Sequence, residues 1–165
     1  MPEAVSDSST LIHLASISLL GLLNEFFEHV LIPPAVWQEV VVQGAGRKGA
    51  SDVRQANSDE WLIVETPAPN PILHFLRAKL DDGEAESIAL ALERLPEVLL
   101  LDEEHARAIA RQLGVRITGA VGILLRAKLA GLIPLLRPEL DQLRGSGHCY
   151  LSQAIYESVL RQSGE

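Results

Sequence analysis

The sequence predicts an α/β fold, a three-layer α/β/α arrangement whose central parallel sheet has about five strands. Short apolar segments alternate with segments of helical periodicity, a pattern typical of parallel strands joined by helices. The apolar run 98–101 has no polar interruption, as expected of a strand covered on both faces. With 165 residues, of which 47% are hydrophobic, the chain is predicted to form a single domain over residues 1–165.

The first half of the chain is predicted to contribute three strands. The first, over residues 4–7, ends in an acid, and the leucines that follow it recur at helical spacing with polar residues between them. A second strand, 30–32, is stopped by two prolines, which suit the first turn of a helix over 35–43. Three glycines predict a mobile loop over 44–49. A third strand over 61–64 and a helix over 71–80 follow.

The second half is predicted to supply two more strands between helices. Four apolar residues after Gly83 have the i, i+3, i+4, i+7 spacing of a buried helical stripe: Ala85, Ile88, Ala89 and Leu92. The strand 98–101 ends at Asp102, a helix over 106–113 is terminated by Gly114, and a short strand covers 115–118. The remaining helices are predicted over 119–130, 138–143 and 150–161.

Charge and composition exclude several classes of protein. The chain has 22 acidic and 14 basic residues, a net charge of −8, which argues against broad electrostatic adhesion to nucleic acid or to anionic membranes. Cys149 is the single cysteine, so an internal disulfide framework and a CxxC motif are excluded. Residues 1–3 lack the basic start of a targeting signal, and the apolar stretch 11–23 is too short to span a membrane. We therefore expect a cytoplasmic protein without membrane association.

Four acids stand where the fold would gather them. Asp7 and Asp102 end the first and fourth strands, Glu39 lies in the helix after the second strand, and Glu84 opens the helix before the fourth. In open parallel sheets the carboxyl ends of the strands form the ligand-binding crevice. Clustered carboxylates repel one another unless a cation holds them, and without paired His or Cys ligands they favour Mg²⁺ or Mn²⁺ over zinc. The five histidines form no HxH or HExxH pattern.

Each acid also has a purely structural interpretation. Asp7 and Asp102 each precede a helix and could act as its N-cap. Asp81 with Glu84 resembles a capping box, and Glu39 could be an ordinary surface residue of an amphipathic helix.

Neighbouring polar residues have secondary candidate roles. Ser9 and Thr118 could orient water near the site, although such residues usually cap helices. Glu103 and Arg107 stand at i, i+4 spacing, which first of all predicts a solvated ion-pair face and only then a phosphate contact through Arg107. Glu86 is expected to face away from Glu84 into solvent.

Four sequence blocks together resemble the signature blocks of PIN domains. They are VSDSS at 5–9, IPPAVWQEV at 32–40, LDDGEAESIALA at 80–91 and LLLDE at 99–103. The later segments 118–128 and 131–133 are similar to a prokaryotic PIN-like branch close to toxin-type PIN proteins. The resemblance covers nearly the whole chain.

This resemblance implies a ribonuclease that binds one or two Mg²⁺ or Mn²⁺ ions through Asp7, Glu39, Glu84 and Asp102. Many relatives have Asp where this chain has Glu84, and a further Asp or Asn where it has Glu103. The implied products carry a 3′-hydroxyl and a 5′-phosphate, and the implied partners are an RNA substrate and a small antitoxin. With this net charge, RNA affinity should rest on a few basic residues: Arg107, Arg126 and Lys128.

Two other functions compete with this one. A phosphate-transfer protein would need a second acid beside Asp7 or a DxD motif, and the sequence Asp7-Ser8-Ser9-Thr10 has neither. A non-catalytic binding module, with a structural metal or none, would use the acids as helix caps. The apolar face of the helix over 150–160 also suggests a homodimer, although packing into the chain's own core is the more usual role for such a face.

Overall fold

The computed structural model describes residues 2–165 and confirms the predicted three-layer α/β/α architecture. Within these residues the central sheet has five parallel strands: β1 (Glu3–Ser6), β2 (His29–Ile32), β3 (Leu62–Val64), β4 (Val98–Leu100) and β5 (Ile117–Thr118). Their order is β3-β2-β1-β4-β5. The chain therefore builds the sheet outward from β1 in one direction and then resumes on its other side with β4. The carboxyl ends of β1 and β4, where Ser6 pairs with Leu100, form the switch point of the sheet.

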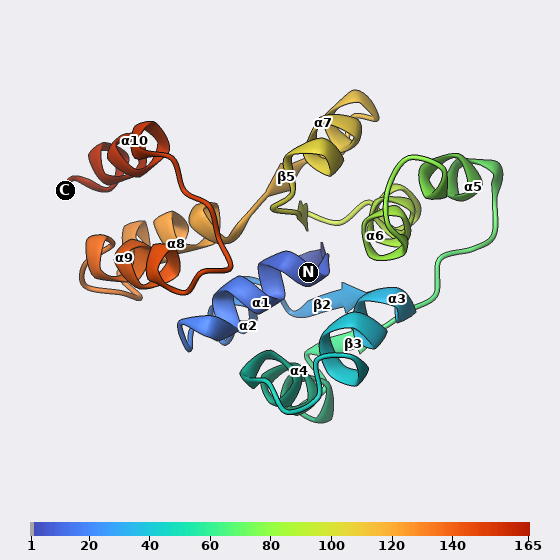
Figure 1. The fold of residues 1–165 in the computed structure, drawn as a ribbon, viewed down its shortest axis with the longest axis horizontal. Coiled ribbons are helices and arrows are strands. Elements are labelled where there is room, and N and C mark those ends of the chain that lie inside the picture. Colours follow the sequence, from blue (N-terminus) through green and yellow to red (C-terminus); the bar gives the residue numbers. More distant parts are fainter. Residues whose placement is uncertain (1) are drawn as a thin grey trace.

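Alternating side chains of the strands point into two separate cores. Ala4 and Leu100 belong to the larger core, whereas Val5 and Leu99 belong to the smaller one. The larger core is covered by α1 (Ser8–Ser16), α2 (Leu22–Phe26), α4 (Lys48–Ser58), α8 (Ala120–Leu129), α9 (Arg137–Gly145) and α10 (Gln153–Ser163). The smaller core is covered by α5 (Pro71–Arg77), α6 (Asp82–Arg94) and α7 (Glu104–Gln112). Figure 1 shows α8, α9 and α10 on one side of the molecule and α5 and α6 on the other.

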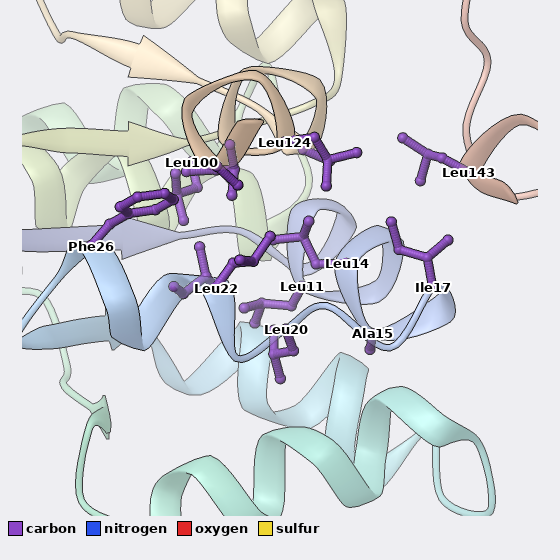
Figure 2. Close-up of a cluster of buried hydrophobic side chains, with 14 of the residues drawn as sticks. Leu11, Leu14, Ala15, Ile17, Leu20, Leu22, Phe26, Leu100, Leu124 and Leu143 are labelled. Atoms are coloured by element: carbon purple, nitrogen blue, oxygen red, sulfur yellow. The ribbon is translucent and has the colours of Figure 1, made fainter. Parts of the chain in front are cut away.

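The larger core holds the first helices against the sheet. In Figure 2, leucines of α1, α2, β4 and α8 converge: Leu11, Leu14, Leu22, Leu100 and Leu124. Because α1 begins directly after β1, this packing fixes the orientation of the residues at the carboxyl end of that strand.

Two segments differ from the sequence prediction. The leucine pattern after β1 is divided between two helices, because the chain turns at Ser18, whose φ is 62°, and resumes helical structure at Leu22. The predicted loop over 44–49 is shorter in the structure, where a few turns lead into α4. This helix was not predicted, because the sequence 48–58 is mostly polar. This helix buries only a narrow stripe of small side chains: Ala50, Val53 and Ala56.

The segment after β2 combines two helical geometries. A short α3 (Pro34–Trp37) continues as a π-helical turn, η1 (Gln38–Val42), in which the Gln43 amide donates to the Gln38 carbonyl. A Cβ atom at Gly44 would lie 2.3 Å from the Val40 carbonyl oxygen, so the close turn that ends this segment requires glycine. Across residues 2–165, none of the helices combines the length and the apolarity needed to cross a bilayer.

Candidate functional site

Asp7 lies at the switch point of the sheet, between β1 and α1. Its amide donates to the Leu100 carbonyl at 3.0 Å, and its Oδ1 accepts the Thr10 amide at 3.0 Å as the N-cap of α1. The residue is only 2% exposed. Within residues 2–165, hydrogen bonds engage only one of its two carboxylate oxygens. The structural and the functional interpretation of Asp7 are therefore compatible, because the cap leaves Oδ2 free.

Asp102 follows the neighbouring strand β4 and joins three elements. Its Oδ1 accepts the Ala120 amide at 3.0 Å, at the start of α8, and its Oδ2 lies 2.8 Å from His13 Nδ1. Asp102 does not cap the helix directly after it, which is its structural interpretation from the sequence, because Glu103 fills that role by accepting the Ala106 amide at 2.9 Å. Asp102 instead contacts a helix that begins after the next strand.

His13 is the main residue of the site that sequence reasoning missed. It lies in α1, is 8% exposed, and contacts Asp102 through Nδ1 and the His148 carbonyl through Nε2 at 2.9 Å. The available signal was a histidine inside an apolar helical segment that follows a strand-end acid. Its two partners stand 89 and 135 residues away in the chain, so no local pattern could reveal them.

Glu39 reaches the site from η1. The residue is exposed, as its structural interpretation predicted, yet the Ser8 hydroxyl donates to its Oε2 at 2.5 Å. A Cβ atom built on Gly83 would lie 3.4 Å from Glu39 Oε2 and 3.6 Å from both Asp81 Oδ1 and Ser8 Oγ. The starts of α1 and α6 and the π-helical turn therefore meet around Gly83. Wide helical turns of this kind are frequent at functional sites.

Glu84 lies at the start of α6, where Asp81 is the N-cap. Asp81 Oδ1 accepts the Glu84 amide at 2.8 Å, which is one half of the predicted capping box. Burial raises the pKa of Glu84 to about 8, and the charges of Asp81 and Glu103 add to this rise. Asp7 contributes to it as well, which places Glu84 within electrostatic reach of the switch point.

The expectation that Glu86 faces solvent is wrong. Glu86 is only 7% exposed, and its Oε1 lies 3.6 Å from Arg77 Nη2 of α5. The reason is tertiary: α6 contacts both α5 and α3, so the side of the helix away from the sheet is also covered. Burial raises the pKa of Glu86, while the nearby Arg77 charge opposes this effect.

Burial is the main cause of the raised pKa values at the centre of the site, and repulsion between the acids adds to it. Burial raises the pKa of Asp7 to about 7, against the opposing effect of the Thr10 amide, and the Asp102 charge raises it further. Burial alone would lower the pKa of His13, but hydrogen bonding to Asp102 and its charge raise it overall. Burial thus favours the protonated form of Asp7, and the contact with Asp102 favours the protonated form of His13.

The donor set fits a hard divalent cation in chemistry, since it consists of carboxylate oxygens whose repulsion a cation would relieve. Among residues 2–165, no three His, Cys, Asp or Glu side chains are grouped closely enough to surround one ion.

A groove of about 850 Å³ opens beside Asp102. All four residues predicted to assist the site line it: Ser9, Glu103, Arg107 and Thr118. Part of its wall is formed by the segment 148–152 and by Ile155 of α10. A second hollow, of about 420 Å³, is lined by Asp81, Glu84 and Glu103. Glu103 therefore lies between the two depressions, whereas Asp7 and Glu39 line neither of them.

The basic residues of the region are partly committed to structural contacts. Arg107 Nη1 donates to the Leu101 carbonyl at 2.6 Å, and the predicted Glu103–Arg107 pair is absent among the described residues because Glu103 caps α7. Arg126 lies outside the groove lining, with its guanidinium 4.3 Å from the Phe26 ring centre. Lys128 also lies outside it and donates to the Pro134 carbonyl.

The chain is similar to one protein family and to a solved structure. A family model of a PIN domain (DUF3368) matches residues 3–165. Among solved structures, the chain is similar to a PilT N-terminus domain protein, SSO1118, from the hyperthermophilic archaeon Sulfolobus solfataricus P2. That similarity has a TM-score of 0.47 and 17% sequence identity, and it covers 92% of this chain and 98% of the other. No curated protein matches the chain.

Proposed function

Because the chain belongs to the PIN-domain family, whose fold is of nuclease type, we propose that it is a metal-dependent ribonuclease that hydrolyses RNA phosphodiester bonds. The observation that carries this proposal is the pair of acids at the switch point of the sheet. Asp7 is buried there with a pKa raised to about 7, and Asp102 stands beside it at the edge of an 850 Å³ groove. Burying a carboxylate costs free energy unless its charge is paired, and a bound cation would supply that pairing.

In this proposal Asp7, Glu39, Glu84 and Asp102 hold one or two Mg²⁺ or Mn²⁺ ions. Such an ion, when bound, would neutralise the acids, polarise the scissile phosphate and make attacking hydroxide available near neutral pH. Glu39 is already oriented by the Ser8 hydroxyl, and Glu84 by the first turn of α6. The acidic net charge is then no obstacle to binding an anionic substrate, because a bound cation dominates its local field.

The protein's own groups would position the RNA strand. A strand lying in the groove would pass Ser9 and Thr118, whose hydroxyls can donate to phosphate oxygens, and Arg107, which supplies positive charge. It would thereby bring a phosphate next to Asp102. Hydrolysis at this point would leave a 3′-hydroxyl and a 5′-phosphate.

The test is cleavage of mixed single-stranded RNA in Mn²⁺, Mg²⁺ or EDTA by the wild type, Asp7→Asn and Asp102→Asn. We expect cation-dependent cleavage that falls at least about 100-fold in either variant, as is typical when one charged group is removed from a reacting centre. Circular dichroism checks that each variant is folded. Asp59→Asn, at an exposed position after α4, is the matched control and should cleave normally. Cleavage that persists in EDTA, or in folded Asp7→Asn, would refute the proposal.

One observation favours a second candidate, a non-catalytic PIN-like module that binds a partner with a structural metal or none. Asp7, Asp81 and Glu103 each cap a helix through a side-chain oxygen. If this were their whole role, neither the wild type nor its variants would cleave RNA, and calorimetry would detect no divalent-ion binding.

The remaining sequence-based proposals concern partners. A role as the toxin of a toxin–antitoxin pair, with a small antitoxin as partner, stays a prediction. So does the homodimer, although α10 directs Tyr156, Val159 and Leu160 into the core of its own chain. Light scattering that detected only a monomer would end the dimer proposal.

A further inference from the structure

A largely buried imidazole connects Asp102 of the acidic site to the segment 148–152, and all three line the groove. His13 Nδ1 lies 2.8 Å from Asp102 Oδ2, and its Nε2 lies 2.9 Å from the His148 carbonyl oxygen. The ring is almost completely shielded from solvent within α1 and the elements packed on it. Neither the resemblance to PIN domains nor the proposed chemistry assigns a role to this residue.

The chemistry of the two partners determines what the imidazole does. A backbone carbonyl can only accept a hydrogen bond, so Nε2 must donate to His148. The Oδ1 atom of Asp102 is engaged by the Ala120 amide, so its Oδ2 is the oxygen that contacts the ring. The ring is thus held on both sides, and when it is protonated its bond to Asp102 is charge-assisted. The two nitrogens of an imidazole lie on different sides of one rigid ring, so a single side chain can contact both partners.

The bridge joins two parts of the groove that the sequence keeps far apart. Asp102 and the segment 148–152 both line the groove. Tyr150, which is 92% exposed, lies in this segment. Asp102 has no second side-chain partner on the His13 side, and the His148 carbonyl has no other donor, among residues 2–165. One side chain therefore links the acid to the wall, in addition to the Ala120 amide that holds Asp102 and the packing of Leu151 into the larger core.

We infer that His13 is a positioning residue that orients Asp102 toward the groove and holds the 148–152 segment in place as the wall along which RNA would lie. The part that concerns Asp102 rests on the proposed ribonuclease function. The part that concerns the wall does not, because it can be measured on the protein alone.

Two conservative variants separate the two halves of the bridge. The amide nitrogen of Asn can occupy the place of Nδ1, so His13→Asn keeps a donor toward Asp102 and loses the one toward His148. The longer Gln carries its amide nitrogen near the place of Nε2, so His13→Gln keeps the contact with His148 and loses the one with Asp102. His13→Ala removes both. His74→Asn, at an exposed position in α5, is the control.

Two measurements test the contacts of His13 with Asp102 and with His148 independently. Steady-state RNA cleavage should show kcat lowered at least about tenfold in His13→Gln and His13→Ala, the usual effect of losing a group that orients a metal ligand. His13→Asn should keep kcat near that of the wild type and show a raised KM. Hydrogen exchange of the amides in 148–152 should be faster than in the wild type for His13→Asn and His13→Ala, and unchanged for His13→Gln.

A histidine that only fills space would not give opposite effects in the Asn and Gln variants. If Asn and Gln variants show the same kcat, KM and exchange rates as each other, His13 only fills space in the core and the inference is wrong. If His13→Ala fails to fold, the comparison of Asn with Gln still decides. If the wild type cleaves no RNA, the proposed function fails, and the exchange pattern alone upholds or overturns the role of His13.

Discussion

Asp7→Asn is expected to be more stable than the wild type above pH 7 when no divalent cation is present. Burial, with the Asp102 charge adding to it, raises the pKa of Asp7 from 3.8 to about 7 in the folded protein. The folded state therefore binds this proton more tightly than the unfolded state. The contribution of Asp7 to the wild type's free energy of unfolding is therefore greatest below about pH 4. This contribution falls as the pH rises toward 7.

The size of this effect follows from the pKa difference. A shift of about three pKa units corresponds to about 4 kcal/mol of unfolding free energy as an upper limit, because each unit is worth about 1.4 kcal/mol. Asn stays neutral at every pH, and its side-chain oxygen can still accept the Thr10 amide, so the cap of α1 is kept. The advantage of the variant should therefore grow between pH 4 and pH 7 and then level off.

Urea unfolding in EDTA at pH 5 and pH 8 measures this difference. Saturating Mg²⁺ should reverse the order at pH 8, because a cation that binds only the folded wild type stabilises it and leaves Asp7→Asn almost unaffected. Asp59→Asn should show neither effect. A variant as stable as the wild type at both pH values, with no response of either protein to Mg²⁺, would mean that Asp7 is only a helix cap, because Asn caps a helix about as well as Asp.

Gly119→Ala is expected to lower RNA cleavage about 100-fold and to cost about 1–3 kcal/mol of stability. The backbone of Gly119 is extended, with φ of −137°, so alanine is not excluded by its conformation. Its Cβ, however, would lie 2.1 Å from Asp102 Oδ1 and 3.2 Å from Asp102 Cγ, with Arg107 Nη1 at 3.3 Å. The Asp102 carboxylate must therefore leave the place where it contacts both His13 and the start of α8.

Gly21→Ala is the matched control for this variant. Gly21 has a helical backbone, and a Cβ atom there meets nothing within 4 Å. Thermal unfolding and single-turnover cleavage of both variants give the comparison. Wild-type cleavage by Gly119→Ala, together with unchanged stability, would show that the position of Asp102 is not required.

The parts of the site that the sequence could predict are those set by local chain geometry. Asp7 and Asp102 were placed together because parallel strands end at the same edge of a sheet, and their strands proved to be neighbours. The cap formed by Asp81 depends on a spacing of three residues, which is visible in the sequence. The uninterrupted apolar run before Asp102 likewise revealed a strand with a core on each face.

What could not be predicted depends on contacts between distant segments. Glu86 is buried because α3 and α5 both pack on α6, which the periodicity of α6 alone does not show. Asp102 contacts α8 rather than the adjacent α7, and His13 meets a carboxylate 89 residues away. The sequence does not predict α4, because the buried stripe of this helix is narrow and the rest of its surface is polar. In each case tertiary packing, not local preference, decides the outcome.

Calorimetric titration of Mn²⁺ into the wild-type protein at pH 7, in two buffers of different ionisation enthalpy, tests most directly whether these acids form a cation site. Burial raises the pKa of Asp7 to about 7 and that of Glu84 to about 8, so both carboxyls hold protons in part at this pH. A cation must displace those protons. We expect binding with release of about one proton, and weaker binding at pH 6. Absence of binding, or binding without proton release, would contradict a cation site built from these carboxylates.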